Sequence, residues 1–324
     1  MMRALRHLPL LLALICALPS KALADERYAV IVTGASGGQE YAQQYEQWTS
    51  SLQRVLQGRM KIDAANITVL TETAAAARRS TAENVRRAIA GVSKRMTASD
   101  LLFVVLIGHG TYDGVDAKFN LVGPDLESAE WASLVEGLPG RIVLVNTSSA
   151  SFPFIERVTG ERRIVITATD SVAQRFDTIF PDYFIKAFED EQADLDKNGR
   201  VSIWEAFTAA AGGVRRHYQQ RGQLATERPL LDDNGDGRGR DAVEAGDDGS
   251  AASRTYLDQQ TANAAPTDDV LLDLLQKRAV IEGEIDELKL RRSFMQPPDY
   301  QKEFERLMIE LSRIGRAVRE RIKS

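Results

Sequence analysis

The fold is decided by residues 101–151, which read LLFVVLIGHGTYDGVDAKFNLVGPDLESAEWASLVEGLPGRIVLVNTSSAS. The stretch contains two short apolar runs, at 101–107 and 141–145, and each predicts a buried strand that ends in a small polar turn. The carboxyl ends of parallel strands meet at one edge of a sheet, where α/β proteins bind their ligands. We therefore expect His109 in the first turn and Ser148 in the second to lie side by side in a candidate catalytic site.

The segments on either side of this stretch alternate between strands and helices. The pattern predicts further strands at 28–33, 67–70 and 163–167, and helices at 41–56, 80–96 and 126–136. Ser80 and Glu83 have the spacing of a capping box at the start of the second helix. Residues 114–126 contain a Gly-Pro turn and predict a small hairpin, either a flap over the site or a simple connection. Strands that alternate with helices favour an α/β fold with a doubly wound, mainly parallel sheet.

Residues 1–24 have the pattern of a secretory signal peptide. A basic start is followed by an apolar run, too short to span a membrane, and by an A-x-A cleavage signal. Cleavage removes Cys16, the single cysteine, and with it any disulfide, thiolate zinc site or thiol nucleophile. We expect a periplasmic or secreted protein without stable membrane insertion. Lipidation at Cys16 is the less favoured alternative, because Ile15 is larger than the residue expected before a lipidated cysteine.

The net charge argues against nucleic acid as a partner. The chain has 41 Lys and Arg against 46 Asp and Glu, and loss of Arg3, Arg6 and Lys21 with the signal peptide leaves 38 against 46, a formal charge of −8. An acidic chain repels phosphate backbones and anionic membranes. The remaining length is sufficient for one sizeable core with appendages.

The clearest chemical motif is DLDKNGRVSIWE at 194–205, which has the spacing of an EF-hand calcium loop. The predicted ligands are Asp194, Asp196 and Asn198 at positions one, three and five, the Arg200 carbonyl at seven, Ser202 at nine and Glu205 at twelve. Gly199 takes the sharp turn at position six. Phe184 and Phe188 give the preceding helix an apolar face, so the context agrees with a helix–loop–helix that binds Ca²⁺.

A second acidic run, DDNGDG at 232–237, begins in the same way. Position twelve counted from Asp232 is Val243, so the bidentate glutamate is missing. Two interpretations stay open: a Gly/Asp turn, which the sequence favours, and a partial or accessory calcium site within 232–241. With one complete loop in an exported protein, we expect structural calcium at extracellular concentrations over a cytosolic type of switch.

The chain divides into an α/β domain at 25–190, the EF-hand loop and outgoing helix at 191–220, and two further segments. Residues 221–267 are rich in Gly, Asp, Ala, Gln and Arg and predict a loop or linker. Residues 268–324 predict an antiparallel helical hairpin, or coiled coil. Its periodic apolar residues are Leu271, Leu274, Ile281, Ile285 and Leu288 in the first helix and Phe304, Leu307, Leu311, Ile314 and Val318 in the second.

Proline punctuates this hairpin. Pro297 and Pro298 are predicted to stop its first helix, and Asp299 to cap its second. The hairpin is a candidate for binding a protein partner or a second copy of the chain, and the alternative is that it packs on the α/β domain.

The strand and turn order of the first half resembles the caspase-like fold, and within it the legumain-like (C13) cysteine peptidases. The likeness rests on the run YAVIVTGASGG at 28–38, the apolar strand that ends in Gly-His-Gly and the apolar strand that ends in NTSSAS, and it covers residues 28–190. In those enzymes a histidine in a His-Gly turn activates a cysteine just after the next strand. The resemblance implies a caspase-like sheet for this chain.

The match to the catalytic residues of this family is partial. His109 and Gly110 match the histidine turn, whereas Ser148 stands where the family has its cysteine. In the first turn the family's Asn-Tyr-Arg-His run aligns with EYAQ at 40–43, so its asparagine and basic residues are unmatched. A serine hydroxyl needs an oriented base and an oxyanion hole, whereas a thiolate forms readily beside histidine. The resemblance therefore implies a relict site, without the family's peptidase activity.

These features predict an exported calcium-binding pseudoenzyme that serves as a binding or scaffolding module. The alternative is a serine-dependent peptidase or esterase that uses Ser148 and His109, with Asp113 or Asp116 as the carboxylate that orients the histidine. A third hypothesis is a calcium-responsive regulator, in which calcium release loosens the helix of Phe184 against the sheet.

Overall fold

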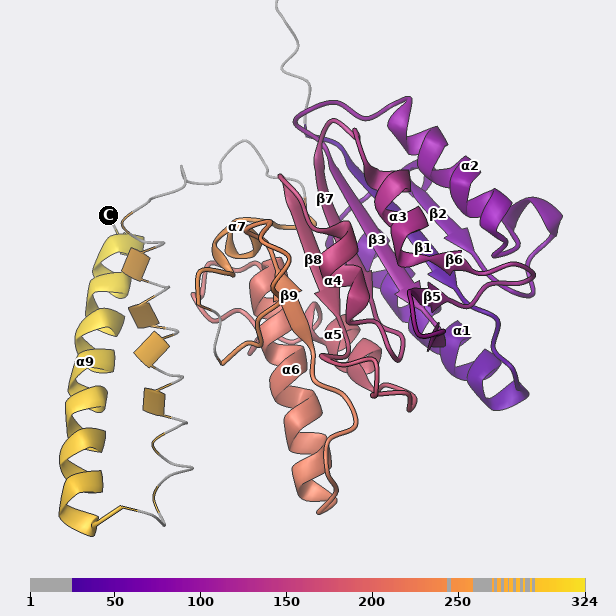
Figure 1. Cartoon of the computed structure of the whole chain (residues 1–324). Helices are drawn as coiled ribbons and strands as arrows, with labels where there is room; N and C mark the ends of the chain where they lie inside the picture. Colours follow the sequence, from indigo (N-terminus) through magenta and orange to yellow (C-terminus); the bar gives the residue numbers. More distant parts are fainter. Residues whose placement is uncertain are drawn as a thin grey trace, which may run out of the picture.

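The computed structural model describes residues 25–243, 246–258 and 295–323, together with scattered residues between 270 and 292 (Figure 1). The predicted signal peptide, with Cys16, lies outside these residues. The strands are β1 (Arg27–Thr33), β2 (Ile67–Leu70), β3 (Leu101–Ile107), β4 (Gly110–Tyr112), β5 (Ala117–Phe119), β6 (Leu126–Glu127), β7 (Arg141–Asn146), β8 (Arg163–Thr167) and β9 (Leu230–Asp232). The helices are α1 (Gln39–Arg54), α2 (Ala82–Ser93), α3 (Ser128–Val135), α4 (Pro153–Val158), α5 (Phe180–Ala187), α6 (Ile203–Gln220), α7 (Ser250–Ser253) and α9 (Pro297–Lys323), with short π or 3₁₀ turns at Val55–Arg59, Ala64–Asn66 and Ala76–Arg78.

The main sheet has six strands in the order β2-β1-β3-β7-β8-β9. Neighbouring strands from β2 to β8 are parallel, and β9 is antiparallel to β8. All seven residues of β3 are buried. A run of apolar residues without polar alternation is what a strand covered on both faces requires. The predicted α/β architecture with a mainly parallel sheet is therefore confirmed.

Helices cover both faces of this sheet (Figure 1). The face that carries Ile31 and Phe103 packs against α1, α5 and α6. The opposite face, which carries Val30 and Leu102, packs against α2, α3 and α4. Burying each large apolar side chain contributes about 1.5–3 kcal/mol before the entropy of folding is counted. The two cores hold the strands in register and so fix the turns at the carboxyl edge.

Two local predictions differ from the structure. Helix α2 begins at Ala82, and its N-cap is Thr81, whose hydroxyl accepts a hydrogen bond from the Asn84 N–H. Ser80, the predicted cap, is fully buried one residue too early. A three-stranded antiparallel sheet, β4-β5-β6, takes the place of the hairpin predicted at 114–126, because the chain pairs as soon as it leaves the His109 turn.

The segment predicted as a loop or linker, 221–267, contributes a strand to the main sheet. β9 pairs with β8 through Leu230, Leu231 and Asp232, all of which are buried. The sequence prediction missed this strand because only two apolar residues mark it, between a polar loop and an acidic run. Residues 230–232 of this segment therefore belong to the α/β core.

The described residues after 270 include α9 and helical residues that run alongside it (Figure 1). Ile281, Ile285, Leu288 and Leu307 form a small buried cluster. Leu271 lies outside the described residues. α9 begins at Pro297, so the two prolines occupy its first turn, where a missing N–H costs nothing, and Asp299 lies within that turn and is not the cap. Across the part of the chain that the structure describes, no helix is long and apolar enough to span a membrane.

Candidate functional site

The turns after β3 and β7 meet at the carboxyl edge of the sheet, as their parallel pairing requires. The contact is at Gly110: a Cβ on this residue would lie 2.5 Å from Ser148 Oγ and 2.3 Å from the Ser149 carbonyl oxygen. The Ser149 hydroxyl also donates to the Gly110 carbonyl at 3.1 Å. His109 and Ser148 therefore lie on two turns that touch.

His109 makes polar contacts through both ring nitrogens. Its Nε2 lies 3.0 Å from the Ser36 carbonyl oxygen, and its Nδ1 lies 3.1 Å from Asp177 Oδ1. A carbonyl oxygen only accepts, so Nε2 must carry a proton to make this bond. In this arrangement the nitrogen that a catalytic base would use is already occupied as a donor.

Asp177 is the carboxylate beside His109, and no sequence motif predicts it. Of the two candidates in the His109 loop, Asp113 pairs with Lys118 at 2.9 Å, and Asp116 accepts a hydrogen bond from Ser128. Asp177 comes from the loop between β8 and α5, in no recognisable motif. Only the fold brings it to the histidine.

Ser148 bonds to Asn146 and not to the histidine. Its hydroxyl donates to Asn146 Oδ1 at 2.7 Å, and the Asn146 carboxamide also accepts from the Ser148 N–H at 3.0 Å. The serine is 1% exposed. Among the hydrogen bonds of the described residues, none joins Ser148 to His109. The side chain closes the turn after β7 and makes none of the contacts of an activated nucleophile.

Tyr41 covers this edge of the sheet. Its ring lies edge-on to His109, with centroids 4.7 Å apart, and its hydroxyl donates to Asp177. Tyr45 lies on the same side, with its ring centroid 5.7 Å from that of His109. A cavity of about 10 Å³, room for no more than one water molecule, lies among Tyr41, Tyr45, Ser149 and Asp177.

A larger hollow of about 300 Å³ lies beside the small sheet. It is lined by Tyr112, Val115, Phe152, Arg157 and Asp170, among others. The β4–β5 turn therefore borders an open hollow next to α4.

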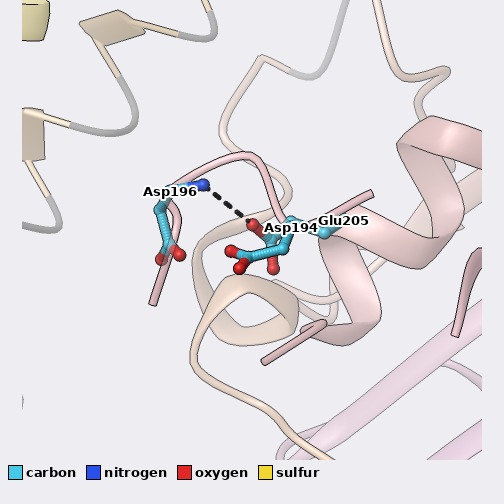
Figure 2. A group of neighbouring side chains, drawn as sticks. All are labelled: Asp194, Asp196 and Glu205. Atoms are coloured by element: carbon cyan, nitrogen blue, oxygen red, sulfur yellow. Dashed lines mark hydrogen bonds between the residues drawn. The ribbon is translucent and has the colours of Figure 1, made fainter. Parts of the chain in front are cut away.

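The predicted calcium loop lies between α5 and α6, two helices that pack on the same face of the sheet. Oxygens of Asp194, Asp196 and Glu205 all lie within 4.8 Å of one another (Figure 2). Asp194 and Glu205 are buried, and Asp196 is half-buried. The loop therefore gathers positions one, three and twelve of the predicted ligand set.

Backbone N–H groups of the loop hold these carboxylates in place. Asp194 Oδ2 accepts from the Gly199 N–H at 2.9 Å. Glu205 Oε1 accepts from the N–H groups of Leu195 at 2.8 Å and Asp196 at 3.3 Å, the latter drawn in Figure 2. Gly199 has φ +83°, a left-handed conformation that suits the glycine of position six. Glu205 thus folds back from α6 onto the start of the loop.

The electrostatics of the loop favour a cation. Burial, followed by the charge of Glu205, raises the pKa of Asp196, and burial also raises the pKa of Glu205. Gathered carboxylates repel one another, and a divalent ion would offset both the burial and the repulsion. Oxygen ligands of this kind suit hard cations such as Ca²⁺ and Mg²⁺.

The remaining predicted ligands have clear local roles. Asn198 Oδ1 accepts from the Arg200 N–H at 2.8 Å. The Arg200 guanidinium pairs with Asp258 at 2.7 Å and lies 3.8 Å from the Tyr256 ring centroid. Ser202 is the N-cap of α6 and forms a capping box with Glu205. Segment 255–258 therefore packs on the loop through the Arg200 side chain.

The incoming helix differs from the sequence prediction. α5 ends at Ala187, so Phe188 lies just past it and residues 188–193 connect the helix to Asp194 without helical structure. Phe184 and Phe188 still pack together, with ring centroids 5.3 Å apart, and both are buried. The loop is thus fixed more directly by α6 than by α5.

No protein-family model matches the chain, and no curated protein matches it. Among solved structures, the crystal structure of protein GSU0716 from Geobacter sulfurreducens is similar to it, with 15% identity and a TM-score of 0.42. The likeness covers 64% of this chain and 92% of that chain.

Proposed function

We propose that this chain is an exported calcium-binding protein whose α/β domain is caspase-like and related to the legumain peptidases, and that it works as a binding or scaffolding module without cysteine-peptidase chemistry. The observation that carries the calcium site is the close group formed by Asp194, Asp196 and Glu205, held by loop N–H groups. Ca²⁺ accepts six to eight oxygen ligands in flexible geometry, which a loop of carboxylates and carbonyls can supply.

Two observations support the loss of peptidase chemistry. Ser148 replaces the thiol nucleophile and bonds to Asn146, while His109 bonds to Ser36 and Asp177. Tyr41 packs edge-on against His109, and its hydroxyl donates a hydrogen bond to Asp177. A nucleophile without a base lacks the arrangement that acyl transfer requires.

The scaffolding half of the proposal is supported by the surface of the C-terminal helices. Large apolar side chains are exposed there at Val270 (55%), Val280 (60%), Met308 (42%) and Ile309 (46%). Exposed apolar groups on paired helices favour contact with a protein partner or a second copy.

Calorimetric titration of the chelator-treated protein with CaCl₂ tests the calcium site. We expect Ca²⁺ binding with a dissociation constant of about 0.1–1 mM, the range of extracellular modules. Glu205→Gln removes one charge and the bidentate ligand. This variant should bind Ca²⁺ at the 194–205 loop roughly tenfold or more weakly than the unaltered protein does.

Glu189→Gln is the matched control, because Glu189 is exposed and lies outside the loop. This variant should bind calcium as the unaltered protein does. Equal affinities for the unaltered protein and Glu205→Gln would contradict the proposal.

A second candidate function, a serine peptidase or esterase, is favoured by one observation: a carboxylate, Asp177, orients His109 beside the Ser148 turn. Peptide and ester substrates offered in the presence of calcium, with His109→Ala and Ser148→Ala in parallel, separate the two functions. We expect no turnover above that of the variants. Turnover that is lost in both variants would establish the hydrolase.

A further inference from the structure

The second acidic run, which follows β9, repeats the hydrogen bonds of the calcium loop position by position. Gly237 at position six donates to Asp232 Oδ2 at 2.7 Å, as Gly199 donates to Asp194 Oδ2 at 2.9 Å. Asp236 at position five donates from its N–H to Asn234 Oδ1 at 2.8 Å, and the Arg238 N–H donates to Asp236 Oδ1 at 2.8 Å. Residues 232–238 therefore have the conformation of the first half of the calcium loop.

Asp248 takes the place of the missing glutamate at position twelve. In the first loop, Glu205 accepts from the N–H groups of positions two and three. In the second, the Asp248 carboxylate accepts from the first of these positions, the Asp233 N–H, at 3.1 Å. The closing carboxylate thus comes from beyond Val243, the residue at position twelve.

Among the described residues, the other oxygen of Asp248 has no hydrogen-bond partner. Asp248 is 8% exposed, and its Oδ2 is a buried atom to which no donor of the described residues bonds. A buried carboxylate oxygen without a donor costs free energy, and the structures that tolerate one have a cation or water to fill the position. The next residue, Gly249, donates its N–H to Asp233 Oδ1 at 2.8 Å, so this end of the segment packs on the acidic run. Within the described part of the chain, a protein donor is therefore absent where acidic residues lie together.

We infer that Asp248 completes a second divalent-cation site with Asp232, Asn234 and Asp236, and that Ca²⁺ is the ion of that site. Asp232 is anchored at the end of β9, where the Thr159 hydroxyl donates to its Oδ2 at 2.9 Å. The two sites share no ligand. The second site can therefore bind calcium even if the first loop does not, and the reverse is also true.

The second site is the weaker of the two. Each site has three carboxylates and one amide, so the difference does not lie in the number of charges. The closing residue of the second site is an aspartate, one methylene shorter than Glu205. Among the described residues, the group of three acidic side chains within 4.8 Å is that of the first loop, so the acidic side chains of the second loop lie farther apart. A shorter closing side chain and more widely spaced carboxylates both lower affinity for Ca²⁺.

Native mass spectrometry of the full chain in CaCl₂, with calorimetric titration, tests this site by stoichiometry. We expect two Ca²⁺ ions per chain, one ion in Asp248→Asn, one in Glu205→Gln and none in the double variant. Asp236→Asn keeps the bond to the Arg238 N–H and should weaken the same second site without unfolding the loop.

Asp247→Asn is the matched control, because Asp247 is the exposed neighbour of Asp248. It should retain two ions. A stoichiometry that is unchanged in both Asp248→Asn and Asp236→Asn would overturn the second site. An unchanged stoichiometry in Glu205→Gln would overturn the first site instead, so the two failures are distinguishable.

Discussion

At the scale of single residues, Gly110 decides whether the turns after β3 and β7 can touch. A Cβ at this position would lie 2.3 Å from the Ser149 carbonyl oxygen, a backbone atom that cannot rotate away. We expect Gly110→Ala to lower the free energy of unfolding by about 1–3 kcal/mol, the usual cost of an overpacked contact. Denaturant unfolding at neutral pH in saturating calcium measures it.

Gly91→Ala provides the contrast to this substitution. Gly91 lies within α2, and a Cβ there would meet nothing within 4 Å. Alanine in a helix is favoured over glycine by about 0.5–1 kcal/mol, so this variant should gain stability. If both variants changed the free energy of unfolding in the same direction, the close contact at position 110 would not explain the effect of Gly110→Ala.

Residue spacing predicted that the acidic side chains of 194–205 would gather, because the positions of this motif lie within twelve consecutive residues. Asp194, Asp196 and Glu205 are indeed gathered. Asp177 and Asp248 could not be found in this way, because each reaches its site through a loop whose path depends on the rest of the fold. A template of fixed spacing detects local ligand sets and misses a ligand that tertiary structure supplies.

At the scale of elements, Glu227 connects the loop before β9 to the start of α5. Its carboxylate accepts from the Ile179 N–H at 2.8 Å, the Phe180 N–H at 3.0 Å and the Tyr218 hydroxyl at 3.1 Å. Burial raises the pKa of Glu227 from its ordinary 4.5 to about 7. The folded protein therefore binds a proton here more tightly than the unfolded chain does.

The sign of the pH dependence follows from this difference. From pH 4.5 to about 7 the native state keeps a proton that the unfolded chain has lost, so this group's contribution to stability is present at low pH and falls as the pH rises. We expect the unfolding free energy to decrease by about 3 kcal/mol across that window relative to Glu227→Gln. Denaturant unfolding at several pH values in saturating calcium measures the difference. A difference between the two proteins that does not change with pH would contradict the assignment.

Elements with strong periodicity were predicted from sequence, and weakly marked ones were missed. β3 is seven apolar residues, a pattern that only a doubly covered strand explains. β9 has three residues, and it forms because β8 offers an unpaired edge and not because its own sequence demands a strand. The order of strands in the sheet is a tertiary property, on which the sequence pattern of each strand has little bearing.

At the scale of the whole molecule, residues 246–258 join the two acidic loops. Asp248 bonds to the second loop, while Ile203, at the end of the first loop, donates its N–H to the Thr255 carbonyl at 2.9 Å, and Arg200 pairs with Asp258. The same segment reaches the sheet, because Arg141 of β7 donates to the Thr255 hydroxyl. Calcium in either loop would therefore stabilise one shared segment.

Removal of calcium should loosen this segment and leave the sheet intact. A ligand at 100 times its dissociation constant stabilises the native state by about 2.7 kcal/mol, so chelation should lower the Tm by roughly 5–10 °C. Hydrogen exchange should quicken in 194–205, 232–238 and 246–258, whereas amides of the buried strand β3 keep their protection. Glu205→Gln in calcium should quicken exchange in the first loop and in part of the shared segment. A segment that two bound ions stabilise should lose protection when both ions leave. Hydrogen exchange in 246–258 that does not change on chelation would therefore show that calcium in the two loops does not stabilise this segment.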